Sequence, residues 1–337
     1  MRTAGRWVAG ALVVAAAGMA NAMEVKPGGV VYSQFAWQTS RYNSAGVRGA
    51  ERGSFDLTRI YAILDVKASD QWRGRITLEG NATAGNPIFV KQGYIEAVNV
   101  WPDGNVSLGL TPATWIGFEE EIWGRRYVAK VLTDQESVLY SNDRGLAASG
   151  KLPGGWGSYR AGVYDGEGLL APEQSGLNGR GKDGSARLSL TPEPVIPALK
   201  GLRVHGFAQV GKTAAGPGHA RSRYIAGVSL ERGSGMLAAN WLWAKTPTAG
   251  GYVKTEGASA YGALKLPARC ALFGRCDWYD PSTGISADAR ERIIVGVERT
   301  MTEGIRLSLN NLHVRQQETN PGRKHDNEVQ LQAELKF

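Results

Sequence analysis

The last eleven residues of the chain, "NEVQLQAELKF", alternate between apolar and polar side chains from Val329 onward. The apolar positions are Val329, Leu331, Ala333, Leu335 and Phe337, and the residues between them are Gln330, Gln332, Glu334 and Lys336. Successive side chains of a β-strand point to opposite faces, so a period of two predicts a strand with one apolar and one polar face. The fold must therefore offer this strand an apolar environment on one side and a polar one on the other, and the apolar side includes Phe337.

The same alternation recurs along the chain, in "WRGRITLEGN", "GSARLSLT", "SRYIAGVSLE" and "GIRLSLNN". Helical spacing fits none of these stretches, and the strand template fits all of them. Together with weaker matches they predict strands at 29–39, 55–67, 72–81, 88–100, 105–111, 145–151, 157–165, 182–191, 201–211, 222–232, 235–245, 256–266, 269–279, 290–300, 304–315 and 327–337.

The connections between these strands alternate in length. "KASDQ", "WPDG", "RGSG" and "MTEG" are short, whereas "RYNSAGVRGAERGS", "TPTAGGYVKTE" and "QQETNPGRKH" are long; 82–87 and "PEPVIPALK" break the rule. Short turns at one end and long loops at the other are typical of transmembrane barrels. A soluble sandwich also has alternating strands, but nothing in it requires alternating loop lengths. We therefore expect an all-β fold: a transmembrane antiparallel β-barrel of about 16 strands, with short periplasmic turns and longer extracellular loops.

The start of the chain predicts export. Arg2 and Arg6 precede an apolar run from Trp7 to Ala17, and Ala20-Asn21-Ala22 matches a small-x-small cleavage site. This pattern is typical of a secretory signal peptide. We expect residues 1–22 to be cleaved, residues 23–337 to form one barrel domain, and the product to reach the outer membrane of a Gram-negative bacterium through the periplasm.

The composition points to no cofactor, metal or nucleic acid. Removing Arg2 and Arg6 lowers the net charge from +8 to +6, and the basic residues form no cluster typical of nucleic-acid binding. Cys270 and Cys276 would lie about 20 Å apart on one strand, too far for a disulfide.

In lipid the apolar face of each strand should point outward, and aromatic residues should mark the membrane interfaces. The candidates are Trp37, Trp72, Trp101, Trp241, Trp243 and Trp278, with Tyr94, Tyr159 and Tyr279 as weaker ones.

The polar face, which should line a water-filled lumen, is rich in arginine. The inward phase holds Arg59, Arg73, Arg75, Arg160, Arg187, Arg203, Arg223, Arg275 and Arg306, against Asp65, Glu79, Glu96, Glu231, Asp277 and Glu334. Fixed cations around a narrow passage attract small anionic solutes, and guanidinium groups suit phosphate or carboxylate oxygens. The same arginines could instead pair with the carboxylates and brace the wall. Both readings remain open, and both can hold for different residues.

The connection 112–144 is long and carries six large apolar side chains. Such a loop is usually functional, and full exposure of these side chains would be costly. We expect it to fold inward as a constriction loop that places Glu119, Glu120 and Glu121 beside Arg125, Arg126 and Lys130 in the pore. The alternatives are an outward surface loop and a further strand at 125–132.

The stretches "FDLTRIYAILDV", "FVKQGYIEA", "NDRGLAASGKL", "YRAGVYDGEG" and "LFGRCDWYDP" resemble the spaced signatures of the phosphate-selective porin O/P family. The resemblance covers most of residues 23–337. It implies an outer-membrane porin, commonly a homotrimer, with inward-folded loops and an arginine-lined pore. The chain is shorter than is typical of that family, and no phosphate-binding lysine cluster can be matched in its loops.

These features predict a porin for passive diffusion of small hydrophilic solutes, with a preference for anions. An enzyme in a barrel is a second class, but His205, His219, His313 and His325 sit in no recognisable catalytic motif. A structural barrel around another envelope protein, such as a threaded electron carrier, is a third. Phe337 resembles the terminal signal by which the outer-membrane barrel assembly machinery recognises its clients, so we expect it to serve delivery as well as anchoring in lipid.

Overall fold

The computed structural model describes residues 23–40, 49–82, 87–166, 168, 181–212, 220–316 and 324–337. The expected signal peptide, 1–22, lies outside the described residues. The strands are β1 (Glu24–Ser40), β2 (Arg52–Lys67), β3 (Trp72–Gly80), β4 (Phe89–Trp101), β5 (Gly104–Pro112), β6 (Asn142–Leu152), β7 (Gly157–Tyr164), β8 (Asp183–Leu190), β9 (Leu202–Lys212), β10 (Ala220–Arg232), β11 (Gly235–Thr248), β12 (Gly251–Leu266), β13 (Cys270–Asp280), β14 (Arg290–Thr302), β15 (Ile305–Gln316) and β16 (Lys324–Lys336).

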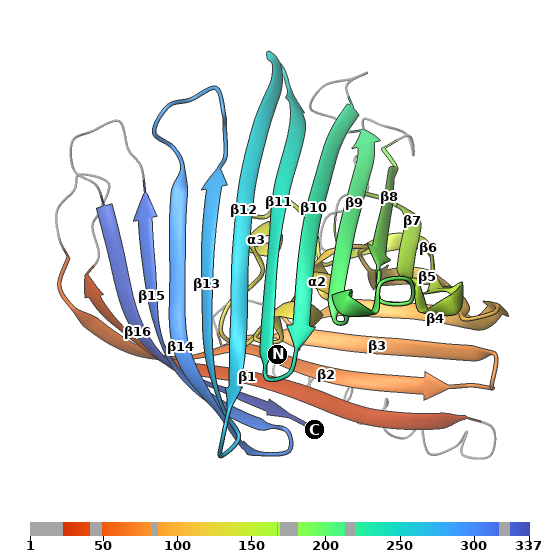
Figure 1. Cartoon of the computed structure of the whole chain (residues 1–337), viewed down its shortest axis with the longest axis horizontal. Helices are drawn as coiled ribbons and strands as arrows, with labels where there is room; N and C mark the ends of the chain where they lie inside the picture. Colours follow the sequence, from red (N-terminus) through yellow and green to blue (C-terminus); the bar gives the residue numbers. More distant parts are fainter. Residues whose placement is uncertain are drawn as a thin grey trace, which may run out of the picture.

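Each strand pairs with its neighbours in the chain, and β1 pairs with β16, so the described strands form one closed antiparallel barrel (Figure 1). The closing register runs from Val30 opposite Lys336 to Ser40 opposite Asn327. Phe337 continues the pairing, because its N–H donates to Gly29 O and its carbonyl accepts from Gly29 N. Closure removes the unpaired edges that an open sheet would expose. The prediction of a closed barrel of about sixteen strands is confirmed.

The two faces of the barrel follow the alternation of the sequence. On β16, Gln330, Gln332 and Glu334 are buried toward the interior, whereas Leu331 on the outer face is 51% exposed. Comparable apolar residues project outward from the neighbouring strands, for example Leu309 and Val295. The barrel is thus apolar outside, and its inner face is polar on strands such as β16, whereas an apolar cluster that includes Phe207 and Leu242 lines another part of it.

Two expectations about the elements were wrong. Residues 246–255, expected to lie in a long loop, continue β11 and β12 as far as the pair Thr248 and Gly251, and only Ala249 and Gly250 remain in the turn. The proline and glycines suggested a loop, but the ladder extends past them. The suggested strand at 125–132 does not exist, because residues 125–131 form turns and irregular structure and a short helix begins at Leu132.

The helices in the described ranges are α2 (Ile116–Trp123) and α3 (Leu132–Gln135), both in the connection between β5 and β6. The same ranges hold two short 3-10 turns, η1 (Pro153–Gly155) and η3 (Pro197–Leu199), in the connections after β6 and β8. None of the helices in the described ranges is both long and apolar enough to cross a membrane.

The aromatic residues do not all face the same way. Trp37, Trp72, Trp241 and Trp243 are exposed on the outer face, and the rings of Trp241 and Trp278 lie 5.7 Å apart. Trp101 Nε1 donates to the Tyr159 hydroxyl at 2.6 Å, also on the outer face. Tyr94 and Tyr279 point inward, and their interpretation as interface residues was wrong: Tyr94 lines an inner pocket and Tyr279 packs in the interior cluster.

Candidate functional site

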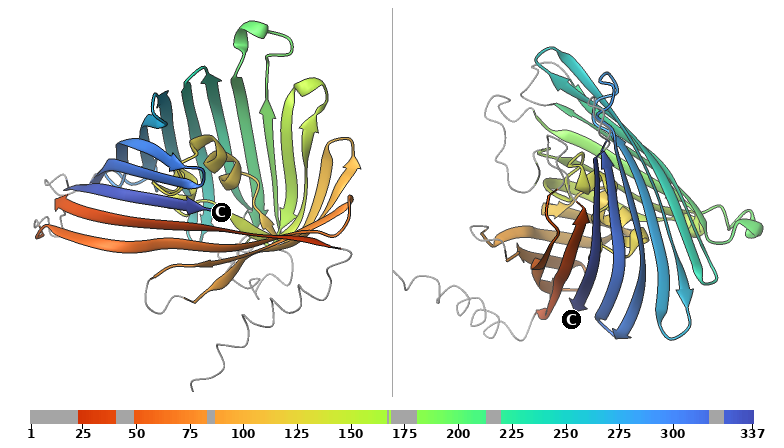
Figure 2. Two further views of the ribbon diagram at one scale, coloured as in Figure 1. Left: turned by 90° about the horizontal axis from the view of Figure 1, so that it is seen from below. Right: turned by 90° about the vertical axis from the view of Figure 1, so that its left-hand side faces the viewer.

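The connection between β5 and β6 lies within the ring of strands (Figure 2). Its side chains Trp115, Ile116, Trp123 and Leu132 are buried in one apolar cluster with wall residues of β9 to β14, among them Phe207. We call residues 113–141 the inner segment. Burying four large apolar side chains contributes roughly 1.5–3 kcal/mol each, which explains why this stretch turns inward and not toward water.

Glu119 fixes α2 to the wall. Its carboxylate accepts from Trp115 Nε1 at 2.6 Å and from Asn240 Nδ2 on β11 at 2.9 Å. The side chain is only 1% exposed. Burial, offset in part by the charge of Arg275, raises the pKa of Glu119 to about 7. This carboxyl group therefore changes charge near neutral pH.

Glu298 on β14 is a second anchor for the inner segment. One carboxylate oxygen pairs with Arg125 Nη2 at 3.1 Å, and the other accepts from the Tyr127 hydroxyl at 2.7 Å. Arg306 Nη1 on β15 lies 3.5 Å from the same carboxylate. A single buried wall carboxylate thus holds two side chains of the inner segment.

Three of the arginines expected to line the lumen hold the backbone of the inner segment instead. Arg223 Nε donates to Val138 O at 2.6 Å, Arg275 Nη1 to Lys130 O at 2.6 Å and Arg306 Nη1 to Gly124 O at 2.8 Å. Buried carbonyls outside regular structure need partners. Arg223 and Arg275 supply them at part-buried positions, and the three guanidinium groups together tie the inner segment to β10, β13 and β15.

The wall of β2 to β4 faces the inner segment from the other side. Arg59 Nη1 and Lys91 Nζ both donate to the Tyr61 hydroxyl, at 2.5 and 2.6 Å. The same two cations flank Glu79, with Lys91 Nζ at 2.8 Å and Arg59 Nη1 at 3.3 Å from its oxygens. We call Arg59, Tyr61, Glu79 and Lys91 the wall cluster; it carries two cations and one carboxylate.

Two β-bulges aim this cluster. The register between β1 and β2 shifts at Thr58, beside Arg59, and the register between β3 and β4 shifts at Lys91. A bulge inserts one residue and re-aims the side chains around it. Lys91 therefore faces inward next to Gln92, which also faces inward and donates to Asn142. Simple alternation would place these two neighbours on opposite faces.

The inner segment presents its own charges toward the wall cluster. Arg126 pairs with Glu120 and with Asp134, the latter at 3.1 Å, and Lys130 Nζ lies 3.5 Å from Asp134. Glu120 interacts electrostatically with Lys91 and Arg59, and burial raises its pKa. The wall cluster and this group together contain four cations and three carboxylates. We call this opposed arrangement the eyelet.

The nine arginines selected from the sequence all project inward, but their surroundings differ. Arg59, Arg75, Arg275 and Arg306 pair with carboxylates at 3.3 Å or less, and Arg203 lies 3.8 Å from Glu231. Within the described ranges Arg73, Arg160, Arg187 and Arg223 form no ion pair; Arg160 donates to Pro112 O and Arg187 to the Ser158 hydroxyl, and Arg187 stacks on Phe118 at 4.0 Å. Bracing thus accounts for several of them, as expected.

The charged residues selected in the inner segment separate into two groups. Glu120, Arg126 and Lys130 belong to the eyelet, whereas Glu119 and Arg125 are buried against the wall. Glu121 lines a cavity beneath the inner segment together with Arg203 and Lys265. Sequence reasoning missed Lys91, Tyr61, Asp134 and Glu298. Glu298 was detectable from its place between outward-facing Val297 and Arg299; Lys91 was not, because the bulge hides its direction.

No protein-family model matches the chain, and no curated protein sequence matches it. Solved structures do match it. An anion-selective porin from Comamonas acidovorans superposes with a TM-score of 0.68 at 14% identity, covering 94% of this chain and 100% of the porin. OmpF of Salmonella typhi, in complex with daunomycin, gives 0.65 at 12% identity over 94% and 98% of the two chains.

The trimer form of OmpT, an outer membrane protein of Vibrio cholerae, gives a TM-score of 0.61 at 12% identity over 94% of this chain and 100% of OmpT. At these identities the likeness shows the fold alone. The chain therefore has the sixteen-stranded barrel of these outer-membrane porins, and membership of the phosphate-selective porin O/P family stays a prediction.

Proposed function

We propose that this protein is a porin in the outer membrane of a Gram-negative bacterium, where it lets small hydrophilic solutes diffuse passively. The eyelet carries this proposal. It sets charged side chains of the inner segment against a charged wall inside a barrel whose outer face is apolar, and it narrows the passage at that level. A polar lumen with a lipid-facing exterior is the arrangement that a water-filled channel needs.

The proposed channel prefers anions, with phosphate and carboxylate groups as the chemistry that its guanidiniums suit. In the eyelet the four cations outnumber the three carboxylates by one. Fixed positive charge around a narrow path raises the local concentration of anions. The likeness to an anion-selective porin agrees with this proposal.

We further propose that the barrel assembles as a homotrimer in outer-membrane lipid, as the trimer form of OmpT suggests by its fold. A barrel that sheaths a threaded partner is less consistent with the structure, because the inner segment fills the interior beside β9 to β14.

Planar-bilayer recording in a potassium chloride gradient tests the proposal. We expect stepwise channel openings and a reversal potential with the sign of chloride preference. A reversal potential with the potassium sign would disprove the anion preference while leaving the channel intact. Protein that inserts as folded trimers or monomers but gives no conductance would disprove the channel itself.

A further inference from the structure

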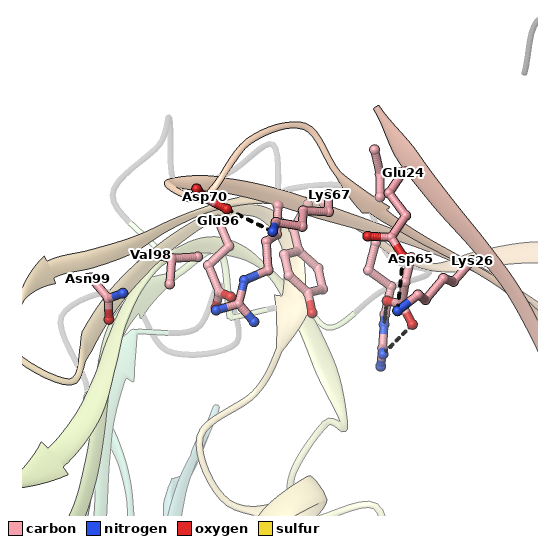
Figure 3. A pocket seen from close by; sticks show the side chains of 13 residues that line it. Glu24, Lys26, Asp65, Lys67, Asp70, Glu96, Val98 and Asn99 are labelled. Carbon is pink, nitrogen blue, oxygen red and sulfur yellow. Dashed lines mark hydrogen bonds and ion pairs between the residues drawn. The ribbon is translucent and has the colours of Figure 1, made fainter. Parts of the chain in front are cut away.

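A pocket of about 560 Å³ opens on the inner wall, at the end of β1 to β4 where the short turn between β2 and β3 lies (Figure 3). It lies apart from the eyelet and shares no residue with it. Its lining holds equal numbers of cations and carboxylates: Lys26, Lys67, Arg73 and Arg75 against Glu24, Asp65, Asp70 and Glu96. A pocket of balanced charge gives a simple anion no net attraction.

Most of these charges already have partners. Three ion pairs join Lys26 Nζ to Glu24 Oε1 at 3.1 Å, Lys67 Nζ to Asp70 Oδ1 at 2.7 Å, and Arg75 Nε to Asp65 Oδ1 at 2.6 Å. Arg75 Nη2 also donates to the second oxygen of Asp65 at 2.9 Å. This last pair is a bidentate arrangement, which is among the strongest that arginine forms.

Arg73 and Glu96 are the two charges that remain. They stand directly opposite each other on β3 and β4. In the described part of the chain neither side chain forms a hydrogen bond or an ion pair. Directly opposed residues of antiparallel strands have Cβ atoms about 4.5–5.5 Å apart. A guanidinium and a carboxylate that form no hydrogen bond or ion pair therefore begin from adjacent points on the wall of the same pocket, although Glu96 also interacts electrostatically with Arg75.

We propose that this pocket binds free α-amino acids. Their ammonium and carboxylate groups are attached to one carbon atom, which matches a cation and an anion that start from directly opposed positions. The Arg73 guanidinium offers planar paired donors to the ligand carboxylate, and Glu96 accepts from the ammonium. Tyr94 and Val98, which also line the pocket, provide apolar contact for the rest of the amino acid.

This proposal goes beyond passive diffusion of anions, because it concerns a zwitterion and a site outside the eyelet. It is tested by binding to the full-length mature protein in detergent, without any current measurement. Isothermal titration with glycine should show saturable binding, and acetate and methylammonium, which each carry half of the ligand's charges, should bind at least tenfold more weakly. A protein that conducts poorly can still give this result.

The variants Arg73→Gln and Glu96→Gln should each weaken glycine binding by about tenfold, since each removes a charge-assisted hydrogen bond. The matched control is the double variant Glu291→Gln with Arg315→Gln. It neutralises an ion pair outside the pocket and should leave glycine binding within about twofold. Acetate binding as tightly as glycine would show an anion site and overturn the proposal. Absence of glycine binding, or equal loss in the control, would overturn it as well.

Discussion

Lys91 shows how a single inserted residue changes the inner wall of the barrel. Strict alternation on β4 assigns Gln92, Tyr94 and Glu96 to the interior and sends Lys91 toward lipid. The bulge at Lys91 turns its ammonium inward, where it meets Tyr61 and Glu79. The hydrophobic pattern of one strand does not reveal a bulge, because a bulge depends on how two residues of that strand pair with one residue of the neighbouring strand. Inward arginines on regular strands were predictable from the sequence, because strict alternation fixes the face to which each side chain points.

Replacing Lys91 with glutamine should therefore lower the anion preference of the proposed channel. The change leaves Glu79 with Arg59 as its remaining cation and takes one positive charge from the eyelet. We expect the chloride-to-potassium permeability ratio to fall roughly twofold or more. Reversal potentials in a salt gradient measure it. Lys254→Gln is the control, since Lys254 is exposed on the outer face of β12; an equal fall in both variants would contradict the assignment of Lys91 to the eyelet.

Glu119 should make the docking of α2 depend on pH. Its pKa rises from an ordinary value of 4.5 to about 7 because it is buried, with Arg275 and Asp277 of β13 and Tyr261 of β12 facing it. Between these two values the docked state holds a proton that the undocked state releases. Docking therefore weakens as pH rises from about 4.5 to 7, by on the order of 3 kcal/mol, and is constant above that window.

Hydrogen exchange of the α2 amides, corrected for the intrinsic effect of pH, measures this dependence. Protection should decline across the window in the unaltered protein and stay flat in Glu119→Gln, which keeps the shape and loses the titrating group. Protection that rises with pH, or that declines equally in the variant, would show that Glu119 is not the group responsible.

At the scale of elements, the inner segment was only partly predictable. Its length and its large apolar side chains indicated an inward fold, but its helices and contacts could not be derived from a short stretch without a clear period. Glu119 and Arg125 seemed equivalent to Glu120 and Arg126 in the sequence, and the structure separates them into wall anchors and eyelet residues. The difference lies in partners such as Asn240 and Glu298, which are more than one hundred residues away.

Removing the Glu298 carboxylate should loosen the inner segment. In Glu298→Ala the buried Arg125 guanidinium loses its carboxylate and the Tyr127 hydroxyl loses its acceptor. Breaking a buried pair on one side costs about 3–5 kcal/mol. We expect larger and noisier single-channel conductance and faster proteolysis within 113–141. Glu291→Ala is the matched control, because Glu291 pairs with Arg315 on the outer face. Unchanged conductance and proteolysis in Glu298→Ala would show that the anchor lies elsewhere.

At the scale of the whole molecule, closure of the barrel was predictable because the strands share an apolar outer face. The first and last strands must then pair so that no edge faces lipid. The lengths of the strands were less predictable. The hairpin of β11 and β12 extends to a two-residue turn. Its backbone pairing continues beyond the stretch of alternating apolar and polar residues from which the strand ends were predicted.

Phe337 continues the apolar alternation of β16 on the outer face of the barrel. Its backbone completes the ladder to Gly29, and its ring covers that glycine on the outer face: a Cβ added to Gly29 would lie 2.4 Å from the ring. The ring itself is largely exposed, since the residue is 75% exposed. Such a side chain adds little to the stability of a finished barrel. We therefore expect the ring to act in recognition during assembly.

Replacing Phe337 with alanine should therefore lower the amount of protein in the outer membrane severalfold, whereas Phe337→Tyr should retain it. Alanine keeps the backbone pairing to Gly29, so the purified variant should still refold in detergent and unfold at nearly the same temperature. Membrane fractionation and thermal unfolding, measured side by side, separate delivery from stability. Normal outer-membrane levels of Phe337→Ala would refute the assembly signal, and an equal loss of stability and level would make the ring a structural element only.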